Sequence, residues 1–409
     1  MATKKRGKSV FRSINDWLHL WLGLTSGIIV VIVSVTGCIY AFQHELSDLT
    51  QPYQHVKAEA KPYLLPSELK AIAAKEAFGP QGDTGTNRIT GVSYRTAERS
   101  AIAAFMDKEN GYTTIYLNPY NGDVLKTKIL KRDFFRIILE GHFNLWLPRK
   151  IGQPVVATGI LIFVILLITG LIMWWPKKWN KANRKKSFSI KWSAGKKRVN
   201  YDLHNVLGFY SLALALVLGL TGLVWGFQWF SKSYYWALTG GKTLPKFEKP
   251  VSDTTLTRPA LQLTPEDRLY ASIRKEHPVI TGSIQFQFAY LPKDPYTVIY
   301  NPDPGTYYRR QFRYFDQSTL QEMKGGGLYG RTFEQASTGE KVYRMNYDIH
   351  VGAIAGLPGK ILAFFVSLIC ASLPITGFYV WWGRKKKKSL KKPELKPQKK
   401  IAARVAASF

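Results

Sequence analysis

The sequence has only two cysteines among its 409 residues, Cys38 and Cys370, and both lie within long apolar runs. Two isolated thiols cannot build a disulfide framework, a cysteine-ligated zinc site or an iron–sulfur cluster. The chain also contains no Cys-x-x-Cys-His segment, so any haem that it holds is not attached through thioether bonds. Metal or redox chemistry in this protein must therefore depend on other ligands, chiefly histidine.

Acidic residues are also scarce, with 27 Asp and Glu against 58 Lys and Arg, which gives a formal net charge of +31. The basic excess is concentrated in residues 1–14, 177–200 and 384–409. The long segments 45–153 and 231–357 are closer to balance, with 15 basic against 12 acidic residues and 16 against 12. This distribution argues against nucleic acid as a partner and favours contact of the basic segments with anionic lipid headgroups.

Charge is almost absent from four runs of about 20 residues or more, each long enough to cross a hydrocarbon core of about 30 Å as a helix. We place membrane spans at residues 15–44, 154–176, 201–230 and 358–383. The positive-inside rule predicts that the basic head, middle loop and tail are cytoplasmic and that the two long inserts lie on the opposite, periplasmic side. No small-residue cleavage site follows the first run, so we expect it to remain as an anchor.

The chain contains an internal repeat. His19 and His204 each stand four residues before a glycine and 17 residues before a Thr-Gly pair. Near the other two spans, "LPRKI" parallels "LPGKI" and "TGLIMWWPKK" parallels "TGFYVWWGRK". His142 precedes the first of these Leu-Pro segments and His350 precedes the second. The two halves of the chain therefore have the same plan of span, insert and span.

The order of span, insert and span in each half predicts how the two halves are related in space. Each half begins and ends in the cytoplasm, so an axis along the membrane normal relates the two. The predicted fold is a membrane α-helical four-helix bundle made of two parallel two-span repeats with a pseudo-twofold axis. Equivalent residues then lie at equal depth, so that His19 faces His204 near the cytoplasm and His142 faces His350 near the periplasm.

The inserts at 45–153 and 231–357 have the patterns of small soluble domains. "TTIYLNPYNGDVLKT" and "RRQFRYFDQSTLQEMKG" each predict two short strands and a turn, and "YTVIYNPDPGTY" adds a further strand. "PSELKAIAAKEAF" and "TPEDRLYASIRKEH" open with helix-capping patterns. Each insert is thus predicted to be a small α+β domain with one main helix and an antiparallel sheet.

The four paired histidines have the chemistry of haem ligands. An ionisable group within a membrane span is costly and usually functional, and two imidazoles from facing helices can bind one haem iron. Gly23 and Gly208, one turn after His19 and His204, leave room for a flat macrocycle, and the nearby Asp16 and Asp202 are candidates for orienting the imidazoles. The alternative is that these histidines are amphipathic interface residues. A metal without porphyrin is disfavoured, because no partner stands at helical spacing.

The remaining histidines lack this pairing. His44 ends the first span and its repeat position holds Trp229, so symmetry supplies no partner for it. It could replace one of the outer ligands, bind a haem propionate or reach the membrane interface. His55 and His277 lie in the inserts, where surface positions are expected.

Two further groups of residues are candidates for contact with the membrane interface and with the substrate. The tryptophan pairs at 174–175 and 381–382 precede basic residues and predict aromatic anchors at the cytoplasmic interface. Aromatic and basic side chains at 307–310 could contact an anionic chelate, although a solvated strand face explains them as well; they are Tyr307, Tyr308, Arg309 and Arg310.

Several of these segments resemble the PepSY-associated transmembrane proteins: "LHLWLG", "LHNVLG", "EGHFNLWLP", "DIHVGAIAGLPGK", the two "TG…WW" span ends and "YLNPYNGDVL". Within that family the chain is similar to the FoxB-like siderophore reductases of the bacterial inner membrane. The resemblance implies two haem b groups in a four-helix bundle, held by His19, His204, His142 and His350, and electron transfer outward to Fe(III)-siderophores. No flavin or nicotinamide segment is visible, so the expected donor is a cytoplasmic molecule or a quinol.

The expected function is thus that of a ferric-siderophore reductase, an oxidoreductase that needs no catalytic acid or base of its own. Two other functions remain open. The PepSY-like inserts could regulate or inhibit a periplasmic peptidase without redox activity, or the bundle could be a component of haem or metallophore transport.

Overall fold

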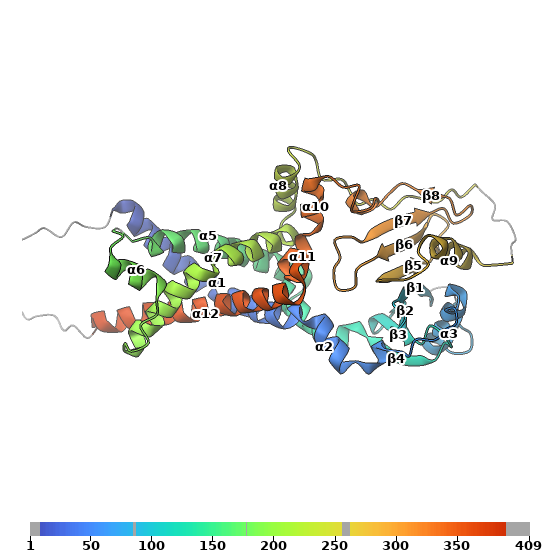
Figure 1. Cartoon of the computed structure of the whole chain (residues 1–409), viewed down its shortest axis with the longest axis horizontal. Helices are drawn as coiled ribbons and strands as arrows, with labels where there is room; N and C mark the ends of the chain where they lie inside the picture. Colours follow the sequence, from blue (N-terminus) through green and yellow to red (C-terminus); the bar gives the residue numbers. More distant parts are fainter. Residues whose placement is uncertain (1–8, 85–86, 177, 256–261, 390–409) are drawn as a thin grey trace, which may run out of the picture.

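The computed structural model describes residues 9–84, 87–176, 178–255 and 262–389, and the basic residues of the predicted head at 1–8 and tail at 390–409 lie outside these ranges. The molecule is elongated, with a helical bundle at one end and a β-sheet at the other (Figure 1). We call the end of the bundle that faces the sheet its sheet end. The opposite end, where α1 begins and α12 ends, is its terminal end.

Among the described residues, four helices are long and apolar enough to cross a membrane. They are α1 (Val10–Ala41), α5 (Arg149–Trp174), α7 (Lys196–Gly226) and α12 (Gly356–Ser389). Helix α1 packs against α5 and α12, and α7 packs against the same two helices, so α1 and α7 occupy opposite corners of the bundle. Exchanging the two halves of the chain leaves these contacts unchanged, as the sequence repeat predicts.

The first and third spans end at equivalent positions of the repeat. Helix α1 ends before Phe42 and α7 ends before Phe227, and neither phenylalanine has helical backbone angles. New helices begin at the next residue, α2 (Gln43–Thr50) and α8 (Gln228–Leu238). The membrane helices therefore stop short of the predicted ends at 44 and 230, because non-helical backbone at Phe42 and Phe227 interrupts them.

The strands of both inserts form one antiparallel sheet of eight strands in the order β4-β3-β2-β1-β5-β6-β7-β8. The first insert contributes β1 (Ile89–Arg95), β2 (Ala101–Asp107), β3 (Gly111–Leu117) and β4 (Val124–Ile129). The second contributes β5 (Ser283–Gln287), β6 (Tyr296–Asn301), β7 (Gln311–Phe315) and β8 (Glu322–Met323). Strand β1 pairs with β5, from Gly91 opposite Gln287 to Arg95 opposite Ser283.

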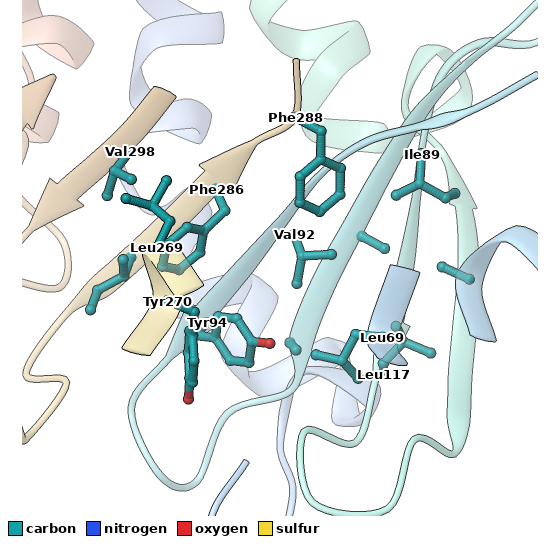
Figure 2. Close-up of a cluster of buried hydrophobic side chains, with 14 of the residues drawn as sticks. Leu69, Ile89, Val92, Tyr94, Leu117, Leu269, Tyr270, Phe286, Phe288 and Val298 are labelled. Carbon is teal, nitrogen blue, oxygen red and sulfur yellow. The ribbon is translucent and has the colours of Figure 1, made fainter. Parts of the chain in front are cut away.

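This pairing corrects the expectation of two separate domains. In two separate sheets, β1 and β5 would each be an edge strand with unpaired backbone groups. Paired with each other, they satisfy these groups and bury a common core of side chains from both inserts, including Val92 and Tyr94 of the first and Phe286 and Val298 of the second (Figure 2).

One helix from each insert contributes side chains to the core on the sheet, α3 (Pro66–Phe78) and α9 (Pro265–Glu276). Glu68 accepts the backbone N–H of Leu65, and Thr264 accepts that of Asp267, so the predicted first turns are capped. The backbone N–H and hydroxyl of Ser67 donate to the Asp267 carboxylate at 2.9 and 2.6 Å, which joins the two helices.

Shorter elements connect the sheet to the bundle. Helix α4 (Phe134–Asn144) packs against α1 and α5, and α11 (Asn346–His350) packs against α7, so both bring residues to the sheet end. The other helices are α6 (Lys181–Phe188), α10 (Thr338–Arg344), η1 (Pro52–Gln54), η2 (Leu130–Arg132), η3 (Gly327–Tyr329) and η4 (Ala353–Ala355).

Candidate functional site

The structure brings the four histidines together in the two pairs that the repeat predicts. His19 of α1 faces His204 of α7, with ring centroids 6.4 Å apart. His142 of α4 faces His350 of α11, with centroids 6.1 Å apart. In each pair the two imidazoles come from different halves of the chain.

These separations fit one metal ion between each pair of imidazoles. Two metal–nitrogen bonds of about 2 Å, with each ring centre about 1 Å beyond its nitrogen, give a centroid separation of roughly 6 Å. Among the described residues no three His, Cys, Asp or Glu side chains group as a metal site, so a bare ion would have too few protein ligands. A porphyrin supplies the four further nitrogens, and the two histidine pairs therefore fit haem.

Each pair lines its own cavity. His19 and His204 line a cavity of about 520 Å³ near the terminal end, which we call the terminus-side cavity. His142 and His350 line a cavity of about 670 Å³ near the sheet end, the sheet-side cavity. Both volumes are within the range of cofactor pockets, about 300–1,000 Å³. The terminus-side cavity is also lined by glycines at positions where a flat ligand could approach the helices, Gly23, Gly27 and Gly208.

Each imidazole lies against a Thr-Gly pair of a helix from its own half of the chain. The Nδ1 to Oγ1 distances are 2.9 Å for His19–Thr169, 3.0 Å for His204–Thr376, 3.3 Å for His142–Thr36 and 2.9 Å for His350–Thr221. The glycine that follows each threonine makes room for the ring. A Cβ atom there would stand 3.1–3.3 Å from the Cε1 atom of the histidine, at Gly37, Gly170, Gly222 and Gly377.

These contacts fix the protonation of the imidazoles. The Thr169 hydroxyl donates to Leu166 of its own helix and the Thr221 hydroxyl to Val217, so each oxygen is left to accept the Nδ1–H of its histidine. Nδ1 of His204 also lies 3.0 Å from the Leu373 carbonyl, and Nδ1 of His142 lies 2.9 Å from that of Val33. A carbonyl can only accept, so these nitrogens are donors as well.

With Nδ1 protonated, Nε2 of a neutral imidazole has a free lone pair. None of the four Nε2 atoms has a hydrogen-bond partner in the part of the chain that the structure describes. A metal-bound histidine has this arrangement, with the second ring nitrogen donating to an oxygen that orients the ring. The contacts thus favour metal ligation over an interfacial role.

Three asparagines hold the same threonines in place, and the sequence analysis did not identify them. Each stands four residues before a histidine, and its Nδ2 donates to the backbone carbonyl of the threonine that the histidine contacts. The pairs are Asn15–Thr169 at 3.1 Å, Asn200–Thr376 at 3.0 Å and Asn346–Thr221 at 3.1 Å. The recurring Asn-x-x-x-His spacing was the available signal.

Asp202 does not orient His204. Its Oδ2 accepts Nε–H of Arg198 at 2.9 Å and the backbone N–H of Lys191 at 3.2 Å, and so it ties the start of α7 to the preceding loop. Asp16 lines the terminus-side cavity near His19.

The remaining histidines lie elsewhere. Nε2 of His44 is 3.3 Å from the hydroxyl of Tyr307, and His44 does not line the sheet-side cavity. His277 stacks on Tyr300 at 3.9 Å, and His55 lies 3.9 Å from the Asp48 carboxylate. The structure thus does not bring His44 to the histidines of the sheet-side pair.

The tryptophan pairs divide between two roles. Trp175 and Trp382 are 55% and 52% exposed, as expected of anchors that face lipid. Trp174 is buried, stacks on Phe209 at 3.7 Å and lines the terminus-side cavity together with Trp381. Only one tryptophan of each pair therefore occupies the predicted kind of position.

Comparison with protein-family models decides the family. The model of the PepSY-associated TM region matches residues 17–384. The chain belongs to the PepSY-associated transmembrane family. The match contains all four paired histidines and their Thr-Gly partners, and with the four apolar helices it makes the chain a multi-pass membrane protein. No curated protein matches the sequence.

In this member of the PepSY-associated family, the sheet-side cavity has a polar end. Tyr307 and Arg310 line it, whereas Arg309 pairs with Asp303 and Glu334, each at 3.5 Å. Tyr308, the fourth residue of the predicted substrate-contacting group, does not line this cavity.

A buried carboxylate lies close to the same end. Burial raises the pKa of Asp348 to about 6, although the backbone N–H of Tyr307 donates to its carboxylate and the charge of Arg310 lowers the pKa. The sheet-side cavity thus combines apolar walls around the histidines with charged and phenolic groups on the side of the sheet.

Proposed function

We propose that this protein is an inner-membrane dihaem b electron-transfer protein that reduces Fe(III)-siderophores in the periplasm and releases iron as Fe(II). The observation that supports the proposal best is the presence of two histidine pairs, each at the separation that one iron requires. His19 and His204 would hold one haem, and His142 and His350 the other. Bound haem supplies one-electron redox chemistry.

The chain's own groups set the conditions for that chemistry. The Thr-Gly pairs hold each imidazole with Nδ1–H donating, which raises its basicity as a ligand. The apolar cavity walls exclude water, which with the ligands determines the redox potential. No acid or base is required of the protein, because one-electron reduction breaks no covalent bond.

The two cavities lie close together and share lining residues. Val30 and Phe163 line both of them and are buried, so side chains are packed between the two histidine pairs there. The same side chains belong to a buried cluster with Leu167, Ala215, Val366 and Cys370. Electrons can cross such packed side chains, whereas a haem or metallophore cannot. This packing favours electron transfer over the transport function that the sequence leaves open.

The direction of transfer follows from the proposed orientation. Residues 177–200 are strongly basic and include α6, which lies at the terminal end of the bundle (Figure 1). By the positive-inside rule that end, with both termini, would be cytoplasmic and the sheet periplasmic, and the two halves would be related by an axis along the membrane normal. The donor would be a cytoplasmic reductant or a quinol on the terminal side.

Reduction is enough to release the metal. Fe(II) carries less charge than Fe(III) and prefers softer ligands, so the oxygen donors of a siderophore bind it less strongly. The released ion would then be free for a separate uptake step.

The proposal is tested by mixing reduced, detergent-purified protein with a ferric trihydroxamate chelate under anaerobic conditions. We expect the reduced haem bands to disappear while a ferrous indicator reports Fe(II). The gallium(III) complex of the same chelator is the control, because it has a similar shape but is not reduced. Haem that stays reduced with the ferric complex would refute reductase activity, and a colourless protein would favour the peptidase-regulator alternative.

A further inference from the structure

We infer that Arg310 is the centre of a carboxylate-binding subsite at the sheet end of the sheet-side cavity. The inference rests on the proposed function only in assigning the haem-sized space beside it to a cofactor. Three observations carry it: the position of Arg310 in the cavity wall, the lack of an acceptor for its guanidinium group among the described residues, and the pairing of neighbouring arginines with other groups.

Aromatic rings hold the guanidinium group of Arg310 in place. Its central carbon lies 5.7 Å from the ring centroid of Tyr307, 5.7 Å from that of Phe312 and 5.0 Å from that of Tyr329. Such contacts stabilise the cation and restrict its plane, but they leave the N–H groups without acceptors. Arg310 is thus preorganised at the same cavity that His142 and His350 line.

Within the part of the chain that the structure describes, the guanidinium donors of Arg310 have no hydrogen-bond acceptor. Its Nε is buried without a hydrogen-bond partner, and within the described residues the side chain forms no ion pair. Asp348, whose carboxyl group senses the charge of Arg310, accepts the backbone N–H of Tyr307 at 3.0 and 3.2 Å instead. Arg310 is partly buried, and a partly buried cation whose N–H groups lack acceptors is unfavourable, so an anion that accepts from them is expected to complete the site.

Neighbouring arginines differ from Arg310 in having partners for their terminal N–H groups, although Nε of Arg309 is also buried without a hydrogen-bond partner. Arg309 pairs with Asp303 and Glu334. Arg344 also lines the cavity, but its guanidinium group donates to four backbone carbonyls, those of Tyr308, Leu328, Arg331 and Arg310. It adds positive charge to the cavity wall while its N–H groups are occupied. The two arginines exceed the single charge of Asp348, so this end of the cavity favours an anion.

A second unsatisfied group lines the same cavity. Oδ1 of Asn346 is buried without a partner, while its Nδ2 donates to Thr221. The cavity therefore offers an unused acceptor as well as the unused donors of Arg310. A bound carboxylate with an accompanying water or hydroxyl group would satisfy both.

The planar guanidinium group matches a carboxylate, which it can bind through two parallel hydrogen bonds. Two sources could supply that carboxylate. One is a carboxylate side chain of the porphyrin between His142 and His350, and the other is an anionic chelate that enters from the side of the sheet.

Arg310→Gln tests the inference, with Arg309→Gln as the matched control, since the adjacent residue differs in having acidic partners. Two quantities are measured on the purified full chain: the rate of haem transfer to excess apomyoglobin, and the affinity for citrate by calorimetry. Faster haem loss by about tenfold or more in Arg310→Gln alone would identify the porphyrin carboxylate. A comparable loss of citrate affinity with unchanged haem retention would identify a diffusible anion.

The inference is overturned if Arg310→Gln behaves like Arg309→Gln in both measurements. Size-exclusion profiles and helical content compare the folding of the two variants, and Arg310→Lys serves as a second variant that keeps the charge but loses the paired donors. A wild-type protein without haem would refute the dihaem proposal separately, because citrate binding would still test Arg310.

Discussion

The Nδ1 atom of His19 lies 2.9 Å from the hydroxyl oxygen of Thr169, and Asn15 donates to the backbone carbonyl of the same threonine at 3.1 Å. His204 and His350 have equivalent contacts with Thr376 and Thr221. The bundle thus uses one local arrangement repeatedly to hold an imidazole with its Nε2 free.

Removing a threonine hydroxyl should affect the four sites unequally. In Thr169→Val, Nδ1 of His19 loses the hydroxyl acceptor at 2.9 Å and keeps only a weaker contact with the Leu166 carbonyl, and a poorly satisfied buried donor costs up to about 1–3 kcal/mol. In Thr376→Val, His204 retains the Leu373 carbonyl at 3.0 Å. We therefore expect Thr169→Val to lower haem retention and shift the midpoint potential clearly more than Thr376→Val does. Redox titration and haem content of the two variants measure the difference.

The conservative replacement Thr169→Ser supplies the control, because it keeps the hydroxyl and should restore haem retention. Unchanged haem retention and midpoint potential in Thr169→Val would show that the hydroxyl does not orient the ring.

Adding a methyl group to a Thr-Gly pair should displace the imidazole. A Cβ at Gly377 would stand 3.1 Å from Cε1 of His204, whereas a Cβ at Gly383 in the same helix would meet nothing within 4 Å. We expect Gly377→Ala to lose about half of the bound haem, with an overpacking cost of about 1–3 kcal/mol, while Gly383→Ala keeps its haem. The pyridine haemochrome assay measures both. Full haem content in Gly377→Ala would contradict the placement of His204.

The pairing of β1 with β5, which connects the two inserts, should depend on Gly91. A Cβ there would come 2.4 Å from the Phe286 carbonyl oxygen across the β1–β5 pair, so Gly91→Ala must push the strands apart. We expect a lower unfolding temperature, corresponding to about 1–3 kcal/mol, with an unchanged haem spectrum. Gly195→Ala, whose added methyl group meets nothing within 4 Å, is the control. Unchanged thermal stability of Gly91→Ala would argue against a continuous sheet.

The parts of this structure that the sequence predicts are those with a repeated or periodic signal. The spans follow from apolar runs, and the histidine pairs follow from equal spacing in the two halves. The pairing of β1 with β5 has no such signal, because it joins Gly91 to Gln287, which are separated in the chain by the second and third membrane helices. The two strands pair because each would otherwise leave backbone N–H and C=O groups without partners at the edge of its sheet. This becomes visible only in the assembled fold.

The sequence reveals only part of the role of the Thr-Gly pairs. Their spacing helps to define the repeat, but which histidine contacts which threonine depends on how neighbouring helices pack. The position of Trp174 likewise depends on helix packing that the sequence does not reveal. Its position beside Trp175 predicts a lipid-facing anchor, and the fold instead buries it against Phe209.

The most direct test of the central claim is the haem content of the purified protein and of four single variants, His19→Ala, His204→Ala, His142→Ala and His350→Ala. We predict two haems per chain in the wild type, with a Soret band and sharp α and β bands on reduction. Either variant of one pair should lose the same haem, about half of the total, and keep the other. A wild-type protein without a Soret band at stoichiometric purity, or variants that all keep both haems, would contradict the account.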